Sequence, residues 1–285
     1  MKRWKSIGIL ALAAVLAVCL IRHEQKQAQT ISSMQEQITS LHQALVTATE
    51  AIQDVQRTIQ DSNVTVAYAE EGYNYLAIGN SVTRHLPNEY WWSDAGMAAS
   101  TPDHDYFHLV TEAIREAHPD EEVCSFAVNL VQWEHQANDR AETYIHIDPY
   151  LSSRLDLVTI QLGENAEDLT TYRQDLSELI RHIRGTSPES RIVVIDDVWY
   201  GDAHSSDRRL AAEENGCAFV DLEEIRDNPE YIAGMGQLVY GRNGAEHVIE
   251  HEGVAKHPND LGMEAIAEGI LNVCGIPVPW SSSGK

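Results

Sequence analysis

The sequence predicts a three-layer α/β/α domain with a parallel central sheet, preceded by an N-terminal membrane helix and a coiled-coil stalk. Short apolar segments, several of them rich in β-branched residues, alternate with longer segments in which apolar residues recur every three to four positions. The short segments show no polar alternation, which is typical of parallel strands buried on both faces. Ahead of them stand an apolar run at 7–21 and a heptad repeat at 31–59. We therefore divide the chain into residues 1–23, 24–64 and 65–285.

Strands and helices are expected in alternating order within the last of these segments. The predicted strands are residues 73–78, 123–128, 156–161, 191–195 and 217–222. The predicted helices are residues 104–117, 170–184 and 259–273, of which the second ends at Gly185 and the third follows Pro258. In such a fold, reactive residues are expected beyond the carboxyl ends of the strands.

The charge of the chain excludes an ordinary nucleic-acid-binding protein. Acidic residues outnumber basic ones 44 to 20, which gives a net charge of −24. Residues 1–64 hold six of the bases and five of the acids, so residues 65–285 carry a net charge of −25. Binding to phosphates requires a basic face. We therefore expect an acidic globular domain that does not bind nucleic acid.

The first segment has the features of a signal anchor. Basic residues at positions 2, 3 and 5 precede the 15-residue apolar run. A bilayer core takes about 20 residues, but Trp4 at the interface and a snorkelling Lys5 allow a short span. The run passes directly into Arg22, so a retained anchor is favoured over a cleaved signal peptide or lipidation at Cys19. The chain is then a single-pass membrane protein with its domain outside the cytoplasm.

A heptad repeat follows the anchor. Apolar residues recur every seven positions, with a second set three residues later: Ile31, Ile38, Leu45, Ile52 and Ile59, then Met34, Leu41, Ala48 and Val55. This seam predicts a coiled coil and hence a homo-oligomer. The alternative is a lone amphipathic helix.

Three short motifs lie next to elements of the predicted fold. Gly79-Asn80-Ser81 follows the first strand, Gly163-Glu164-Asn165 follows the third, and His257-Pro258 precedes the last helix. Together these motifs resemble the SGNH (GDSL-like) hydrolase superfamily over about residues 73–275. In that family the serine lies in a G-D-S-like block, an asparagine in G-x-N-D, and the histidine in D-x-x-H-P. The resemblance implies an α/β/α fold and ester hydrolysis without a metal or other cofactor.

The residue types suit acyl transfer. A serine hydroxyl is a weak nucleophile and needs a base, so we expect His257 to take the proton of Ser81 and return it to the leaving group. Asn165 and the backbone N–H of Ser81 are expected to donate to the oxyanion.

The sequence departs from the family pattern at the acid. The family's acid lies three residues before the histidine, where this chain has Val254. Glu252, five residues before His257, is our expected orienter of the imidazole. The alternative is a Ser–His dyad whose histidine is oriented by a backbone carbonyl. Asp260, on the other side of His257, is expected to cap the last helix.

A second departure concerns the oxyanion glycine. The loop after the second strand, Asn129 to Gln132, contains no glycine. We expect the N–H of Gly96 to replace it, or Asn129 to do so.

Aromatic residues indicate where substrate binds. Trp91 and Trp92 lie in the loop after the nucleophile block, and we expect them to line the substrate site with Asn80 and Asn129. Two further pairs of residues follow the second and fourth strands and are also expected at the rim of the substrate site: Trp133-Glu134 and Trp199-Tyr200.

These features lead to one main hypothesis. The chain is expected to be a membrane-anchored, extracytoplasmic serine esterase that removes acetyl or similar groups from carbohydrate or cell-envelope O-esters. The alternatives are an O-acyltransferase with the same site, or an inactive glycan-binding module on a coiled coil.

Overall fold

The computed structural model describes residues 22, 25–27, 29–35, 37–41, 66–137, 139–199 and 202–280, without the side chains of residues 202–204. The chain forms two compact units, Met1–Asn63 and Val64–Lys285. The described part of the first unit is helical, and its apolar residues Ile31, Met34, Ile38 and Leu41 are exposed. The predicted membrane run and the second half of the predicted stalk lie outside the described residues. None of the described helices has both the length and the apolar character needed to cross a membrane.

The second unit is built on a five-stranded parallel sheet, as predicted. Its strands lie in the order β2-β1-β3-β4-β5 and all pair in parallel. They are β1 (Gly72–Gly79), β2 (Glu122–Asn129), β3 (Leu157–Gln161), β4 (Arg191–Ile195) and β5 (Ala218–Val220). Each of these five strands overlaps a predicted strand.

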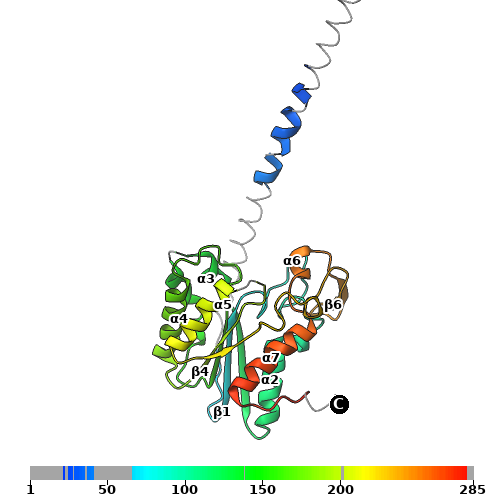
Figure 1. The fold of residues 1–285 in the computed structure, drawn as a ribbon. Coiled ribbons are helices and arrows are strands. Elements are labelled where there is room, and N and C mark those ends of the chain that lie inside the picture. Colours follow the sequence, from blue (N-terminus) through cyan, green and yellow to red (C-terminus); the bar gives the residue numbers. More distant parts are fainter. Residues whose placement is uncertain are drawn as a thin grey trace, which may run out of the picture. The chain divides into compact units, whose positions relative to one another are not determined.

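Helices cover both faces of this sheet (Figure 1). On one face lie α3 (Val131–His135), α4 (Tyr172–Thr186) and α5 (Asp202–Glu214), and on the other lie α2 (Tyr106–Ala117) and α7 (Asp260–Cys274). The two faces bury separate apolar clusters because successive strand residues point to opposite sides. For example, Leu76 and Ile78 of β1 pack with α4, whereas Tyr75 and Ala77 pack with α2 and α7.

A reversal in strand order places the ends of β1 and β3 side by side. β1 pairs with β2 on one side and with β3 on the other. The chain therefore continues toward one edge of the sheet after β1 and toward the opposite edge after β3. Gly79 at the end of β1 is level with both Asn129 and Gln161. In open α/β sheets, ligands bind in the crevice outside the carboxyl ends of the strands at such a point. The loops after β1, β2 and β3 therefore meet at one edge.

A third apolar cluster joins the loop after β1 to the segment before α7. It contains Trp91, Met97 and Ala98 from the loop, Val239 and Ile249 from the hairpin region, and Val254 and Ala255 from α6. The hairpin is formed by β6 (Leu238–Tyr240) and β7 (Glu246–Val248), and α6 is Glu252–Ala255. This cluster holds α6 against the loop that begins at Ser81.

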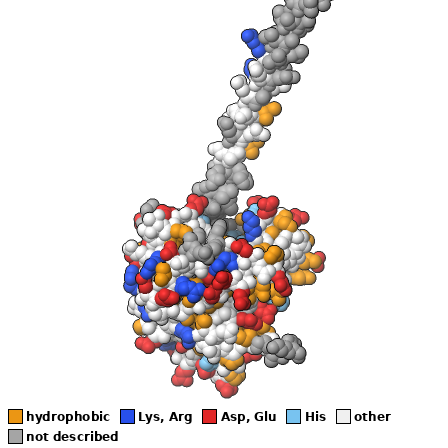
Figure 2. Space-filling view, in the orientation of Figure 1, with side chains coloured by type: hydrophobic (Ala, Val, Ile, Leu, Met, Phe, Trp, Pro, Cys, Tyr) orange, Lys and Arg blue, Asp and Glu red, His pale blue; other side chains and the backbone are white. Residues whose placement is uncertain are grey.

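The sequence analysis missed the elements with little apolar periodicity. α5 has only a short apolar stretch at its carboxyl end, and α3, α6, β6 and β7 are only three to five residues long. Four 3₁₀ helices, η1 (Pro102–His104), η2 (Arg140–His146), η3 (Asp148–Tyr150) and η4 (Pro229–Tyr231), occupy the connections. Acidic side chains are spread over the face of this unit displayed in Figure 2, with basic ones between them.

Candidate active site

Ser81 lies in a tight turn directly after β1. The carbonyl of Asn80 accepts the N–H groups of Thr83 (3.1 Å) and Arg84 (3.0 Å), and the Asn80 side-chain oxygen accepts that of Val82 (3.0 Å). These bonds hold the half-buried Ser81 at the start of the turn. Within the described residues, the Ser81 backbone N–H has no hydrogen-bond acceptor. It is therefore available to a bound group.

The structure brings His257 to this serine. The distance from Ser81 Oγ to His257 Nε2 is 2.7 Å, although the two residues are 176 positions apart. His257 lies between α6 and α7, where its N–H donates to the Val254 carbonyl and its own carbonyl accepts the Ala233 N–H, both at 3.0 Å. The main chain on both sides of the imidazole is thus fixed.

The second ring nitrogen of His257 binds a backbone carbonyl. Nδ1 lies 2.9 Å from the carbonyl oxygen of Gly253. Because a carbonyl can only accept, Nδ1 carries the proton and Nε2 is free to accept one from Ser81. The prediction that Glu252 orients His257 is wrong, because Gly253 occupies that position and the Glu252 side chain is exposed. Val254, three residues before His257, belongs to the third apolar cluster.

Burial keeps His257 uncharged. The pKa of the imidazole is lowered from 6.5 to about 4, chiefly because burial removes the ring from water, and the nearby His85 and His251 act in the same direction. The hydrogen bond to the Gly253 carbonyl acts in the opposite direction. Among the described residues, no carboxylate bonds to the His257 ring, so burial dominates and the imidazole is a neutral base at ordinary pH.

Trp199 supports His257 from the loop after β4, whereas its predicted place at the rim of the substrate site stays a prediction and Tyr200 lies outside the described residues. Its ring contacts the imidazole edge to face, with centroids 4.9 Å apart and planes at 81°. Its indole N–H donates to the Lys256 carbonyl at 2.8 Å, and its backbone N–H donates to Asp197 at 2.7 Å. The ring is therefore fixed at both ends.

Asn165 follows β3 and is tied to a buried glutamate. Its Nδ2 donates to Glu134 Oε2 at 2.6 Å, and its backbone N–H lies 3.4 Å from Glu134 Oε1. The side chain is half-buried, and its amide nitrogen has a second hydrogen. Asn165 can therefore donate to a bound oxygen while it stays bonded to Glu134.

Gly96 does not take the place of the missing oxyanion glycine. Its N–H donates to the buried Asp105 carboxylate at 2.8 Å. A Cβ at this position would lie 2.4 Å from the Val82 carbonyl, so glycine is needed for close packing of the loop. The predicted catalytic role of Gly96 is therefore wrong.

Asn129 binds the loop after Ser81 instead of standing free. Its Nδ2 donates to the Arg84 carbonyl at 2.6 Å, and its Oδ1 accepts the Val131 N–H at 3.0 Å. These bonds join the ends of β1 and β2. They give Asn129 a structural role, and its predicted contact with substrate stays a prediction.

Asn80 is buried and does not line a substrate site. Its Nδ2 donates to Glu134 Oε1 at 3.0 Å and to Glu164 Oε2 at 2.8 Å. With its oxygen bound to Val82 and no exposed surface, the side chain has no atom left for a ligand. The substrate-binding prediction for Asn80 is wrong; its amide holds the serine turn against two carboxylates.

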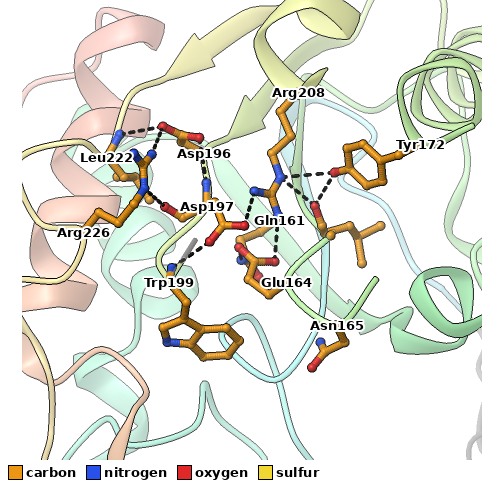
Figure 3. Close-up of polar contacts among 12 residues, drawn as sticks. Gln161, Glu164, Asn165, Tyr172, Asp196, Asp197, Trp199, Arg208, Leu222 and Arg226 are labelled. Carbon is orange, nitrogen blue, oxygen red and sulfur yellow. Dashed lines mark hydrogen bonds and ion pairs between the residues drawn. The ribbon is translucent and has the colours of Figure 1, made fainter. Parts of the chain in front are cut away.

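One of these two carboxylates, Glu164, belongs to a buried charged network (Figure 3). Arg208 of α5 is fully buried and pairs with Glu164 at 3.1 Å and with Asp197 at 2.7 Å. Burial raises the pKa of Glu164, whereas Arg208 acts in the opposite direction. Through Glu164 the arginine supports Asn80, and through Asp197 it supports Trp199. One cation thus supports both the serine and the histidine sides of the site.

A second buried ion pair fixes the loop after β4. Asp196 binds Arg226 at 2.5 Å and accepts the Asp197 N–H at 2.8 Å. Arg226 also donates to the Asp197 carbonyl at 3.0 Å. The roles of Asp196, Asp197, Glu164 and Arg208 were not predicted from the sequence. The available signal was acidic residues close to strand ends, since Asp196 and Asp197 directly follow β4 and Glu164 lies three residues after β3.

The aromatic residues divide between core and surface. Trp91 and Trp133 are 1% and 0% exposed, so the predictions that they line the site are wrong. Trp92 is half-buried and stacks on His247, with ring centroids 4.2 Å apart, and Tyr90 stacks on His251 at the same distance.

Glu134 and Asp260 also differ from expectation. Glu134 is 1% exposed and lies inside the network instead of at the rim. Asn259, not Asp260, caps α7, with its Oδ1 accepting the Gly262 N–H at 3.0 Å. Asp260 instead accepts the N–H and hydroxyl of Ser100 at 2.7 and 2.6 Å.

No protein-family model matches the chain, and no curated protein matches it. Among solved structures it is similar to a two-domain esterase active on acetylated mannans (TM-score 0.46, 14% identity, covering 72% of this chain and 49% of that chain). It is also similar to phospholipase A1 from Streptomyces albidoflavus (TM-score 0.42, 15% identity, covering 72% and 98%). A third is a carbohydrate esterase family 2 enzyme with a carbohydrate-binding domain from Corynascus thermopiles (TM-score 0.41, 15% identity, covering 74% and 69%). The chain spans about half the length of the mannan esterase chains, 49% and 52%.

The lowered pKa of His257 predicts activity in mildly acidic solution. The base must be unprotonated, so kcat/KM for a neutral ester is expected to stay level from pH 7 to about pH 5. It then falls about tenfold per pH unit below pH 4. The measurement is a pH–rate profile, with samples returned from each pH to pH 7 to separate titration from unfolding. An acidic limb near the ordinary histidine value of 6.5 would contradict this expectation.

Loss of Arg208 is expected to destabilise the domain strongly. Arg208→Ala leaves Glu164 and Asp197 buried without their cation, which typically costs about 3–5 kcal/mol of unfolding free energy. Urea unfolding followed by circular dichroism measures the change. The control is Arg173→Ala, which removes an exposed pair with Glu214 and is expected to leave stability unchanged within error. Equal midpoints for the two variants would refute the supporting role of Arg208.

Proposed function

We propose that this chain is a serine ester hydrolase of the SGNH type. The observation that carries the proposal is the 2.7 Å contact between Ser81 Oγ and Nε2 of a buried, neutral His257. The unpartnered Ser81 N–H and the side-chain amide of Asn165, at the ends of neighbouring strands, supply the donors that an oxyanion requires.

The reaction proceeds in two steps with one base. Ser81 Oγ attacks the ester carbonyl carbon while His257 Nε2 takes the hydroxyl proton, and the carbonyl oxygen becomes an oxyanion. The Gly253 carbonyl stabilises the imidazolium through Nδ1–H. Nε2 then gives the proton to the departing alcohol, which leaves an acyl ester on Ser81. A water molecule, deprotonated by His257, releases the acid and restores the serine.

We further propose an acylated carbohydrate or cell-envelope polymer as the substrate. Trp92 and Tyr90, both half-buried, lie in the loop that follows Ser81. Tyr90 stacks on His251, one of the two histidines close enough to His257 to lower its pKa. Aromatic side chains in the loop after the nucleophile can offer a flat face to a sugar ring.

We also propose that the chain is anchored and oligomeric. The apolar run at 7–21 with its basic flank supports a membrane anchor with the domain outside the cytoplasm. Ile31, Met34, Ile38 and Leu41 are 56–70% exposed on the described helix. Such a seam is stabilised when a second copy covers it.

The hydrolase proposal is tested by labelling and by kinetics on the full-length protein. A fluorophosphonate probe is expected to label the wild-type chain and not Ser81→Ala. Hydrolysis of an aryl acetate is expected to fall at least about 10³-fold in Ser81→Ala and His257→Ala. Release of acetate from acetylated polysaccharides then tests the substrate class.

The matched control is Ser153→Ala. Ser153 is exposed and lies shortly before the first residue of β3, at the opposite end of this strand from the site. This variant is expected to keep wild-type labelling and kcat. An unlabelled wild-type protein that releases no acid from any ester would refute the proposal, and binding of glycans by that protein would favour a noncatalytic module.

The stalk proposal is tested by solution mass. Residues 24–285 are expected to form an oligomer in light scattering, and residues 65–285 a monomer, because the seam lies in residues 31–59. Ile38→Lys in the longer chain is expected to weaken the oligomer, since it places a charge in the seam. A monomeric wild-type 24–285 chain would exclude the coiled coil.

A further inference from the structure

We propose that Glu134 is a positioning residue for ester hydrolysis, because it orients the Asn165 amide and the serine turn toward the oxyanion. The inference rests on the proposed function and names a residue that the three family-like motifs do not include. Glu134 lies in α3, directly after β2, and its side chain is 1% exposed.

Every contact of the Glu134 carboxylate is with a neutral N–H donor. Oε2 accepts from Asn165 Nδ2 at 2.6 Å, and Oε1 accepts from Asn80 Nδ2 at 3.0 Å. Oε1 also accepts the backbone N–H of Gly163 and lies 3.4 Å from that of Asn165. Among the described residues, no cation pairs with it within 4.0 Å. The carboxylate is thus held by hydrogen bonds that converge from the loops after β1 and β3.

The carboxylate determines which way the Asn165 amide faces. Ionised carboxylate oxygens only accept hydrogen bonds, so the amide nitrogen and not the amide oxygen must face Glu134. The opposite orientation would place two oxygens in contact at 2.6 Å. One N–H of the amide is then bonded to Glu134, and the other remains for the oxyanion.

The same carboxylate fixes the second oxyanion donor. Asn80 Nδ2 is bonded to Glu134, and Asn80 directly precedes the Ser81 N–H. Gly163 and Asn165 lie in the turn after β3, which is the neighbour of β1 in the sheet. Glu134 therefore sets the distance between two donors that come from different strands. Fixed donors stabilise the transition state because they need no reorganisation during the reaction.

Glu134→Gln tests this role in the full-length protein. Glutamine has the same shape, but its amide nitrogen must face one of the N–H donors that the carboxylate now accepts. We expect kcat for an aryl acetate to fall about 10- to 100-fold while KM changes less than about threefold, because the lost alignment matters only in the transition state. Asn165→Ala is expected to lower kcat about 10²- to 10³-fold.

The double variant separates positioning from general loosening of the fold. If Glu134 acts through Asn165, adding Glu134→Gln to Asn165→Ala lowers kcat by less than about threefold further. The control is Asp175→Asn, which removes the carboxylate partner of Arg140 near α3 and lies outside the catalytic site. It is expected to lower the thermal midpoint but leave kcat unchanged.

Three results would overturn the inference. They are an unchanged or increased kcat in Glu134→Gln, a loss in the double variant equal to the product of the single losses, and a loss of kcat in Asp175→Asn as large as that in Glu134→Gln. If Glu134→Gln does not fold, Glu134→Asp replaces it as the test, because aspartate keeps both carboxylate oxygens but withdraws them by one methylene. This variant is expected to lower kcat at constant KM. Full activity in Glu134→Asp would also overturn the inference. If the wild type hydrolyses esters in a Ser81-dependent way and Glu134→Gln is fully active, this inference alone is refuted. If the wild type is inactive, the proposed function is refuted together with this inference.

Discussion

The hydrogen bond between Ser81 and His257 is the interaction on which the site depends. Its two partners are 176 residues apart, so it forms only when the strand-to-turn junction at β1 and the α6–α7 junction are both fixed. The third apolar cluster fixes them, because it packs the loop after Ser81 against α6. Burial in the same region removes water from the imidazole and keeps it neutral, and therefore able to accept a proton. Packing thus sets the chemistry as well as the distance.

The site orients its histidine without an acidic side chain. A carboxylate at Nδ1 would stabilise the imidazolium and raise the histidine pKa. The Gly253 carbonyl fixes the same tautomer, but it carries only a partial charge, so burial dominates and the pKa falls. Val254 contributes to the apolar cluster that holds α6. Packing of α6 and the Gly253 carbonyl together fix the orientation of the imidazole.

Charged groups lie behind the site instead of within it. Glu164 and Asp197 are buried against Arg208, whereas Glu134 is buried among N–H donors, and each of the three carboxylates binds a segment that carries a residue of the site. Burying such groups costs free energy unless their hydrogen bonds are satisfied. In return the network fixes loops that have no regular secondary structure. The buried carboxylates thus hold the loops that carry the N–H donors of Ser81 and Asn165 in fixed positions.

The amino-acid sequence predicted the five strands of the main sheet, helices α2, α4 and α7, and three polar residues of the site, Ser81, Asn165 and His257. It did so because buried parallel strands leave a local apolar pattern, and because the strand order brings their carboxyl ends together. The folded structure was needed to show that Gly253 orients the imidazole, that Gly96 and Trp91 belong to the packed interior, and that buried charges support the loops of the site. A backbone carbonyl has no sequence signature, and the partner of a side chain depends on which distant segments meet. Local patterns therefore identify the reacting groups, whereas their orientation is a property of the folded chain.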